Sequence, residues 1–260
     1  MPDIRIGGTV IGCEDRGSGP ALLLLPGLGF DRALWAAQVE RFSADHRVIA
    51  LDPRGAGGSS PLRGWRNVLS RQAADIGPVL DRLGVGRVVV CGVSYGGVLA
   101  QRFALDAPDR VAGLVTVDSF AGTRPRSPAE AANLALLYAT GWLWLFPGLL
   151  RPGIRHQYAR WPHALRHLEA GLARMRRLET VKIRYALNRV DHLPELPALG
   201  CPVLAVAGDS PWLVPMSRRI AEAVPDGRLA VVEDSFDPSN LCRPEEFDRV
   251  LAGFLDGIGW

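Results

Sequence analysis

The sequence predicts an α/β protein with a doubly wound, mostly parallel sheet and one helical insertion. Short, continuous apolar runs are typical of strands buried on both faces, and here they alternate with segments of helical periodicity. The alternation stops at residue 121 and resumes near residue 191. Repeated strand–helix units form parallel sheets with right-handed crossovers. We therefore assign residues 1–120 and 191–260 to an α/β core and residues 121–190 to a helical cap.

The first half of the core begins with two expected short strands, Asp3–Ile6 and Thr9–Glu14, joined by a glycine pair. Further strands are expected at Ala21–Leu25, Arg47–Leu51, Arg87–Cys91 and Val111–Val117, and helices at Ala33–Ser43, Arg66–Leu83 and Val98–Ala107. After the insertion, strands at Pro202–Ala207 and Arg228–Val232 alternate with helices at Pro215–Val224 and Pro244–Leu255. Within the cap, the prolines at 147, 152 and 162 are expected to break the helices.

Composition excludes several classes of function. The chain has 260 residues, of which 48% are hydrophobic and 22% charged, as in ordinary globular proteins. A net charge of +3 argues against a nucleic-acid-binding protein. The four cysteines have no C-x-x-C spacing, and the N-terminus has no apolar targeting segment, so we predict a cytoplasmic protein. Glycine and proline interrupt the longest apolar run, Leu134–Leu150, which argues against a membrane span.

The segment Gly92–Gly97 carries the strongest catalytic signal. It reads GVSYGG and lies between an apolar run and a helical stretch, the strand–turn–helix context of a nucleophile elbow. A serine on so tight a turn is strained, and a Cβ on either neighbouring glycine would clash. The pattern therefore predicts that Ser94 faces a ligand.

Three motifs in this order make the chain resemble the α/β-hydrolase family. Residues 25–29 (LPGLG) are similar to the oxyanion loop, with Pro26 where the family usually has histidine. Residues 52–59 (DPRGAGGS) match the family's D-x-R-G-x-G-x-S turn, and Ser94 occupies the elbow. The resemblance implies an oxyanion hole formed by the backbone N–H groups of Leu28 and Tyr95. It implies no cofactor and no metal.

The family's catalytic base is missing from its usual position. In the family, a histidine lies seven residues before the proline that opens the last helix, and here that position is Asp237, before Pro244. The resemblance thus implies a carboxyl group facing Ser94. A carboxylate with a pKa near 4 is a weak base, although an apolar pocket raises such a pKa. An exposed turn at Asp237–Pro238 is the alternative interpretation.

The position of the family's acid is also altered. The segment that normally holds it has Pro211 at the acid position, with Asp209 two residues earlier. Asp118, at the end of the expected strand Val111–Val117, is an acid site that some members of the family use. His192 is a further candidate for a rerouted base, because all five histidines precede the last quarter of the chain. His163 and His167 have metal-ligand spacing without a third ligand, so no metal site is predicted.

The missing histidine favours a non-hydrolytic reaction. A serine, one carboxyl group and an oxyanion hole suit cyclisation, elimination or isomerisation of a hydrophobic carbonyl compound, as in specialised-metabolite biosynthesis. Alternatives are an esterase, lactonase or thioesterase with a rerouted base, and a non-catalytic ligand-binding protein. Aromatic residues expected to line the substrate pocket are Phe30, Trp142, Trp144, Trp212 and Phe236.

The cap differs from the core in charge. It contains eleven arginines, one lysine and three glutamates, which gives a net charge of +9. One interpretation is a mobile lid that recruits an anionic substrate or one bound to an acidic carrier protein. The other is an arginine-rich solvated surface.

Overall fold

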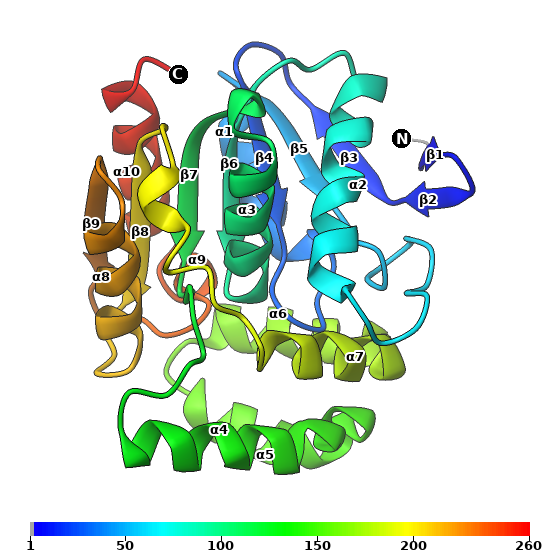
Figure 1. Ribbon diagram of the computed structural model, residues 1–260, viewed down its shortest axis with the longest axis vertical. Coiled ribbons are helices and arrows are strands. Elements are labelled where there is room, and N and C mark those ends of the chain that lie inside the picture. Colours follow the sequence, from blue (N-terminus) through cyan, green and yellow to red (C-terminus); the bar gives the residue numbers. More distant parts are fainter. Residues whose placement is uncertain (1–2) are drawn as a thin grey trace.

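The structure, a computed structural model, describes residues 3–260 and is built on a seven-stranded sheet (Figure 1). The strand order is β3-β5-β4-β6-β7-β8-β9; β3 is antiparallel to β5 and the other neighbours are parallel. This arrangement confirms the predicted doubly wound, mostly parallel sheet. The strands are β3 (Cys13–Arg16), β4 (Ala21–Leu25), β5 (Arg47–Leu51), β6 (Val88–Val93), β7 (Val111–Val117), β8 (Val203–Gly208) and β9 (Gly227–Val232).

Gly12 divides the single strand expected at Thr9–Glu14. β2 (Thr9–Ile11) pairs with β1 (Ile4–Ile6) in a separate hairpin, whereas β3 joins the large sheet. The N–H of Gly12 donates to the Ser59 hydroxyl at 2.9 Å, and a Cβ at Gly12 would lie 2.6 Å from Asp52 Oδ2. The chain therefore leaves one ladder at a point where only a glycine fits against the Asp52 turn.

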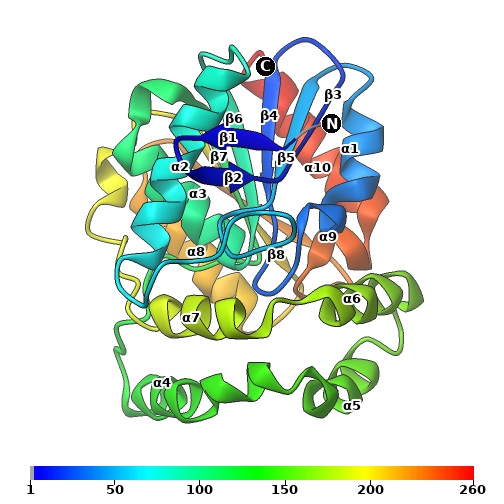
Figure 2. The same ribbon diagram turned by 90° about the vertical axis from the view of Figure 1, so that its right-hand side faces the viewer.

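Helices cover both faces of the sheet (Figure 2). The helices α2, α3 and α8 pack on one face and α1 and α10 on the other, and each face has its own apolar cluster. The core helices are α1 (Ala36–Phe42), α2 (Val68–Arg82), α3 (Tyr95–Asp106), α8 (Leu213–Ala223), α9 (Ser239–Cys242) and α10 (Pro244–Gly257). The short helix α9 was not expected, because a four-residue segment is too short to show periodicity.

The helical stretch between β7 and β8 forms two layers at the carboxyl ends of the strands. Figures 1 and 2 show α6 (Pro162–Arg174) and α7 (Arg177–Leu187) beside the core, with α4 (Pro128–Thr140) and α5 (Pro147–Gln157) outside them. The prolines at 147 and 162 begin helices, as their missing N–H permits. Pro152 instead lies inside α5, four residues after the exposed residue Gly148, so the prediction that it breaks a helix is wrong.

A helix that crosses a membrane needs about 20 consecutive, mostly apolar residues. Within residues 3–260, no single helix combines the necessary length and apolar composition. Only a pair bent by 112°, Pro128–Leu145 with Pro147–Gln157, reaches these criteria when its two parts are taken together.

Candidate functional site

Ser94 lies on the tight turn that links β6 to α3. Its φ angle is 52°, in the region that favours glycine, a strain that typically costs about 1–3 kcal/mol. Two hydrogen bonds hold the strained residue: its N–H donates to Val117 O at 2.7 Å, and the Ser119 hydroxyl donates to Ser94 O at 2.8 Å. The end of β7 thus fixes the backbone of Ser94 on both sides.

The glycines around Ser94 are required by close backbone approaches. A Cβ at Gly92 would lie 2.1 Å from Gly96 O, and a Cβ at Gly96 would lie 2.3 Å from Leu25 O. Real Cβ atoms do not approach this closely, so the turn and the end of β4 can meet only at glycines. A Cβ at either glycine would therefore clash with the backbone, as the sequence predicted.

The backbone N–H groups of Leu28 and Tyr95 are the two donors expected to form an oxyanion hole. Tyr95 is the first residue of α3, where helical N–H groups have no partner in the preceding turn. Leu28 lies in the loop after β4, the strand next to β6. Within residues 3–260, neither N–H has a hydrogen-bond acceptor. The two residues expected to form an oxyanion hole thus carry free donors, and both side chains are buried.

Asp237 and Asp118 form a pair of carboxyl groups beside Ser94. Asp237 precedes α9, and its carboxyl group lies close enough to the Ser94 side chain for Ser94 to lower its pKa. Asp118 follows β7 and is 3% exposed. Its two carboxylate oxygens accept the N–H groups of Gly208 and Ser239, each at 2.6 Å. The structure therefore brings together Ser94 and two of the four side chains considered as its partners.

The two carboxyl groups differ in their electrostatic surroundings. Burial raises the pKa of Asp237 well above its ordinary value, and the charge of Asp118 raises it further. Burial also raises the pKa of Asp118, but its two backbone N–H donors stabilise the charged form. Asp118 therefore ionises first, and Asp237 retains its proton to higher pH.

The other two candidate partners lie elsewhere. His192 is 7% exposed, its backbone N–H donates to Ala121 O at 2.6 Å, and its charged neighbours include Arg102 and Glu195. Burial lowers the pKa of His192 to about 4. Asp209 is exposed beyond the end of β8. Within residues 3–260, none of the five histidines forms a hydrogen bond with either carboxyl group.

The aromatic residues expected to line a substrate pocket do not form one cluster. Phe30 lines the pocket beside the elbow, and Phe236 packs edge-on against Tyr158 with ring centroids 6.0 Å apart. Trp142 packs against Phe146 in the cap and is half-exposed. Trp144 packs against the core, and Trp212, at the start of α8, is 72% exposed. These three tryptophans do not line the pocket beside the elbow.

The junction between α6 and α7 covers the pocket beside the elbow. This pocket is lined by Gly27, Phe30 and Tyr95 and covered by Arg174, Met175 and Arg176, which leave a cavity of about 10 Å³. A water molecule needs roughly this space, and a substrate needs far more. With the cap in this position, this pocket has no room for a substrate.

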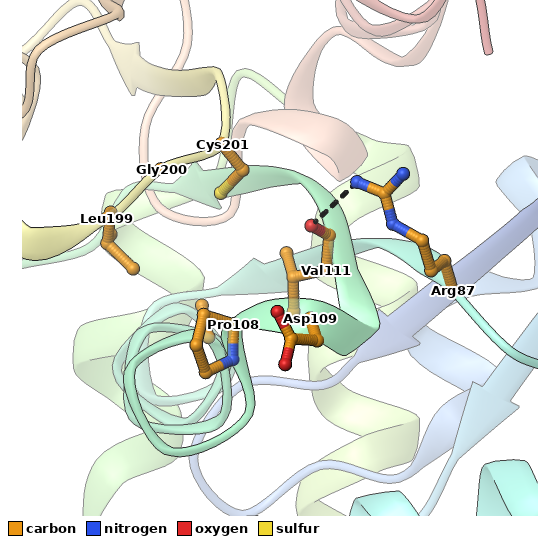
Figure 3. Close-up of a pocket in the computed structure, with 8 residues that line it drawn as sticks. Arg87, Pro108, Asp109, Val111, Leu199, Gly200 and Cys201 are labelled. Carbon is orange, nitrogen blue, oxygen red and sulfur yellow. Dashed lines mark hydrogen bonds between the residues drawn. The ribbon is translucent and has the colours of Figure 1, made fainter.

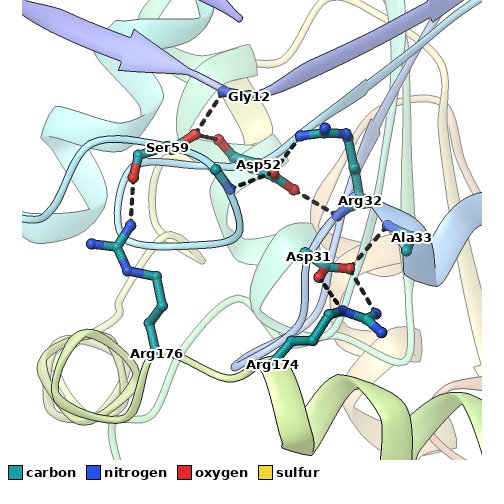
Figure 4. A network of polar contacts seen from close by, with 9 residues as sticks. Gly12, Asp31, Arg32, Ala33, Asp52, Ser59, Arg174 and Arg176 are labelled. Atoms are coloured by element: carbon teal, nitrogen blue, oxygen red, sulfur yellow. Dashed lines mark hydrogen bonds and ion pairs between the residues drawn. The ribbon is translucent and has the colours of Figure 1, made fainter.

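Two arginines attach the α6–α7 junction to the core (Figure 4). The guanidinium of Arg174 forms an ion pair with Asp31 at 2.8 Å, and that of Arg176 donates to Ser59 O. Asp31 follows the loop that carries Leu28, and Ser59 ends the glycine-rich turn that begins at Asp52. These contacts connect the cap to two of the three motifs identified in the sequence.

A larger groove lies at the opposite end of the sheet (Figure 3). It measures about 440 Å³ and is lined by residues before or at the start of β6, β7 and β8, including Arg87, Asp109 and Cys201. Ligands of open α/β sheets bind at the carboxyl ends of the strands, where Ser94 lies. We therefore place the candidate site at the elbow and not in this groove.

Contacts made by Tyr158 and Trp161 were not predicted from the sequence. The Tyr158 hydroxyl donates to Asp237 O, and the Trp161 indole N–H donates to Asp234 O at 2.9 Å. No local pattern marks a cap residue that contacts a loop about 75 positions later.

No group of three side chains that could bind a metal ion occurs within residues 3–260.

The chain was compared with protein families and with known proteins. The model of the alpha/beta hydrolase fold family matches residues 20–241. A protein of Caulobacter sp. (strain K31) named "Putative carbamate hydrolase RutD" is 30% identical over 274 residues, which cover 96% of this chain and 98% of that protein.

Solved structures give the same picture. A thermophilic esterase from Thermogutta terrifontis superimposes with a TM-score of 0.82 at 26% identity, covering 98% of this chain and 97% of that chain. Est816, described as an N-acyl homoserine lactone degrading enzyme, gives 0.79 at 26% identity, covering 97% and 100%. These relatives favour a hydrolase over the non-hydrolytic reaction predicted from the missing histidine.

The raised pKa of Asp237 predicts a pH-dependent gain in stability for Asp237→Asn. In the unfolded chain Asp237 ionises near pH 4, whereas in the folded protein its pKa is raised. The wild type therefore loses stability as the pH rises from 4 through the folded pKa, by about 1.4 kcal/mol for each pH unit that separates the folded and unfolded pKa values. Asparagine does not ionise, so the variant should melt at a higher temperature than the wild type at pH 8. At pH 4 the two melting temperatures should be similar; a constant difference would contradict the assignment.

The ion pair between Arg174 and Asp31 predicts faster opening of the cap in Arg174→Gln. A partly exposed pair contributes up to about 1 kcal/mol, or roughly fivefold in an opening equilibrium. Hydrogen exchange of the amides near the α6–α7 junction should accelerate by this factor. Arg155→Gln is the matched control, because Arg155 pairs with Glu169 inside the cap. Equal hydrogen-exchange rates in the two variants would show that the ion pair with Asp31 does not hold the cap closed.

Proposed function

The chain belongs to the α/β-hydrolase family, and we propose that it is a hydrolase that uses Ser94 and Asp237 to cleave a small carbonyl compound. One observation carries this proposal: Asp237 stands in the place that the resemblance gives to a base, close enough to Ser94 for that side chain to lower the pKa of its carboxyl group. The free N–H groups of Leu28 and Tyr95 beside this pair support a site for a developing oxyanion.

In the first step, ionised Asp237 accepts the proton of the Ser94 hydroxyl while Oγ attacks the substrate carbonyl carbon. The oxyanion that forms is stabilised by the N–H groups of Leu28 and Tyr95, each typically contributing about 3–4 kcal/mol. The C–O or C–N bond then breaks, and the leaving group takes the proton from Asp237. An acyl group remains on Ser94.

In the second step, water attacks the acyl group and transfers a proton to Asp237. The bond to Oγ breaks, and Ser94 recovers its proton from Asp237. The raised pKa of Asp237 assists both transfers, because a base that binds its proton more tightly takes it from an alcohol or water more readily. Asp118 supports the cycle by keeping a negative charge next to the protonated form of Asp237.

An ester, a lactone or a carbamate is the proposed substrate class. The relatives and structural neighbours at 26–30% identity carry names from these three chemistries. In each case a tetrahedral oxyanion forms from a planar carbonyl group, which is the step that two backbone donors assist. The apolar Phe30 ring at the pocket supports a hydrophobic substituent on the substrate.

A non-hydrolytic proton transfer is the second candidate. Asp237 in place of a histidine favours it, because a carboxyl pair that retains one proton can move protons on a bound carbonyl compound without an acyl-enzyme. Cyclisation, elimination and isomerisation are reactions of this kind. They would leave Ser94 unacylated, which separates the two candidates experimentally.

We expect slow hydrolysis of short p-nitrophenyl esters by the wild type and at least a hundredfold loss in both Ser94→Ala and Asp237→Asn. Asp209→Asn is the matched control, since Asp209 is an exposed aspartate at the same end of the sheet. It should retain full activity. Undiminished turnover in Asp237→Asn would overturn the proposed role of this residue.

Asp237→His should increase ester hydrolysis about tenfold or more. An imidazole has a pKa near neutrality and is a better base at pH 7 than a carboxyl group that retains its proton. Labelling of Ser94 by a fluorophosphonate probe should rise in parallel. A wild type that neither hydrolyses esters nor reacts with the probe, beside an active Asp237→His variant, would favour the non-hydrolytic candidate.

The activity of the wild type should increase with pH as Asp237 loses its proton. Because the charge of Asp118 raises the pKa of Asp237, removing that charge in Asp118→Asn should move the rising limb of kcat/KM to lower pH. The profile should be measured with a substrate that does not titrate in this range. An unchanged limb in a folded variant would show that the two carboxyl groups do not interact.

A further inference from the structure

One short segment of the cap contacts the loop that carries Asp237. This segment, residues 158–161, lies between α5 and α6, and the loop comprises residues 234–237. The Tyr158 hydroxyl donates to Asp237 O, and the Trp161 indole N–H donates to Asp234 O at 2.9 Å. The two bonds therefore hold both ends of the loop. Both donors are on buried side chains, 8% and 7% exposed.

Two further contacts join the same pair of segments. The Arg160 guanidinium lies 3.0 Å from a carboxylate oxygen of Asp234, and it stacks on the Trp161 ring at 4.1 Å. The Tyr158 ring packs edge-on against Phe236. Hydrogen bonds, an ion pair and aromatic packing thus act together over four residues on each side.

The opposite side of the loop packs closely against the end of β8. A Cβ at Gly208, the last residue of β8, would lie 3.0 Å from the Cα of Phe236. The N–H of Gly208 also donates to Asp118. The loop is therefore held between the end of β8 and the cap. Tyr158 is the cap residue whose hydrogen bond reaches the backbone of Asp237 itself.

We propose that Tyr158 is a positioning residue, whose hydroxyl holds the Asp237 backbone so that the Asp237 carboxyl faces Ser94. The proposal rests on the function proposed above for Asp237. Because Tyr158 belongs to the cap, correct placement of the carboxyl group depends on the cap being docked. Withdrawal of this segment would release Asp237 O, an acceptor that is costly to leave unpaired in a buried place.

The buried Tyr158 ring also contributes to the desolvation of Asp237. Burial raises the pKa of Tyr158, and the nearby charge of Asp237 raises it further, which keeps the hydroxyl protonated and able to donate. Loss of the hydroxyl leaves Asp237 O unpaired and favours the entry of water into the loop. Water beside the carboxyl group weakens the desolvation that raises the pKa of Asp237.

Tyr158→Phe tests the proposal, because it keeps the ring and removes the hydrogen bond. We expect kcat for a p-nitrophenyl ester to fall about tenfold, with KM changing less than twofold, since the base is misplaced while the pocket is intact. Tyr185→Phe is the matched control: its hydroxyl donates to Tyr138 O at 3.2 Å within the cap. A tenfold loss in the control as well, or none in Tyr158→Phe, would overturn the proposal.

A second measurement needs no substrate and separates this proposal from the proposed hydrolysis. The titration of the Asp237 carboxyl is followed by 13C NMR of aspartate-labelled protein, with Asp237→Asn to assign the signal. In Tyr158→Phe the midpoint should move toward the ordinary range by about one pH unit, and in Tyr185→Phe it should not move. If Tyr158→Phe does not fold, Tyr158→Leu replaces it, with Tyr185→Leu as its control. An unmoved midpoint in the folded variant excludes the positioning role whether or not the enzyme hydrolyses esters.

Discussion

The carboxylate of Asp118 is the interaction on which the rest of the site depends. Its two oxygens accept the N–H groups of Gly208 and Ser239 at 2.6 Å each, and so connect the ends of β7 and β8 with the start of α9. The loop that carries Asp237 leads from β9 to α9 and passes beside Gly208 at the end of β8. A charged group at this buried point therefore has two effects: it fixes the geometry of the loop and raises the pKa of Asp237.

Much of the core could be predicted from the sequence, because its signals are local. The strands Ala21–Leu25, Arg47–Leu51 and Val111–Val117 have the predicted bounds, as continuous apolar runs that are buried on both faces. The elbow at Ser94 was equally clear, since close backbone approaches require its glycines. Gly12 was harder to interpret: the apolar pattern continues across it, and only the fold shows that the chain changes sheet there.

The candidate site could be predicted only in part. Asp237 was found by its distance from Pro244, whereas Asp118 remained one alternative among several, since an aspartate after a strand is also common in turns. Trp212 shows the reverse error: an aromatic residue near the expected acid suggested a pocket wall, yet its side chain is 72% exposed. Tyr158 had no signal at all, because its hydrogen bond joins a cap insertion to a distant loop and has no sequence spacing of its own.

The contacts around residues 234–237 also bear on how this site could change during evolution. Tyr158, Trp161 and Gly208 all hold the loop through its backbone, so the scaffold places few demands on the side chain at position 237. A single codon change there can exchange one proton-transfer group for another while the fold is preserved. The residue at position 237 thus sets the reactivity of the site, whereas the contacts around it set the architecture. The same property makes position 237 a natural starting point for enzyme design.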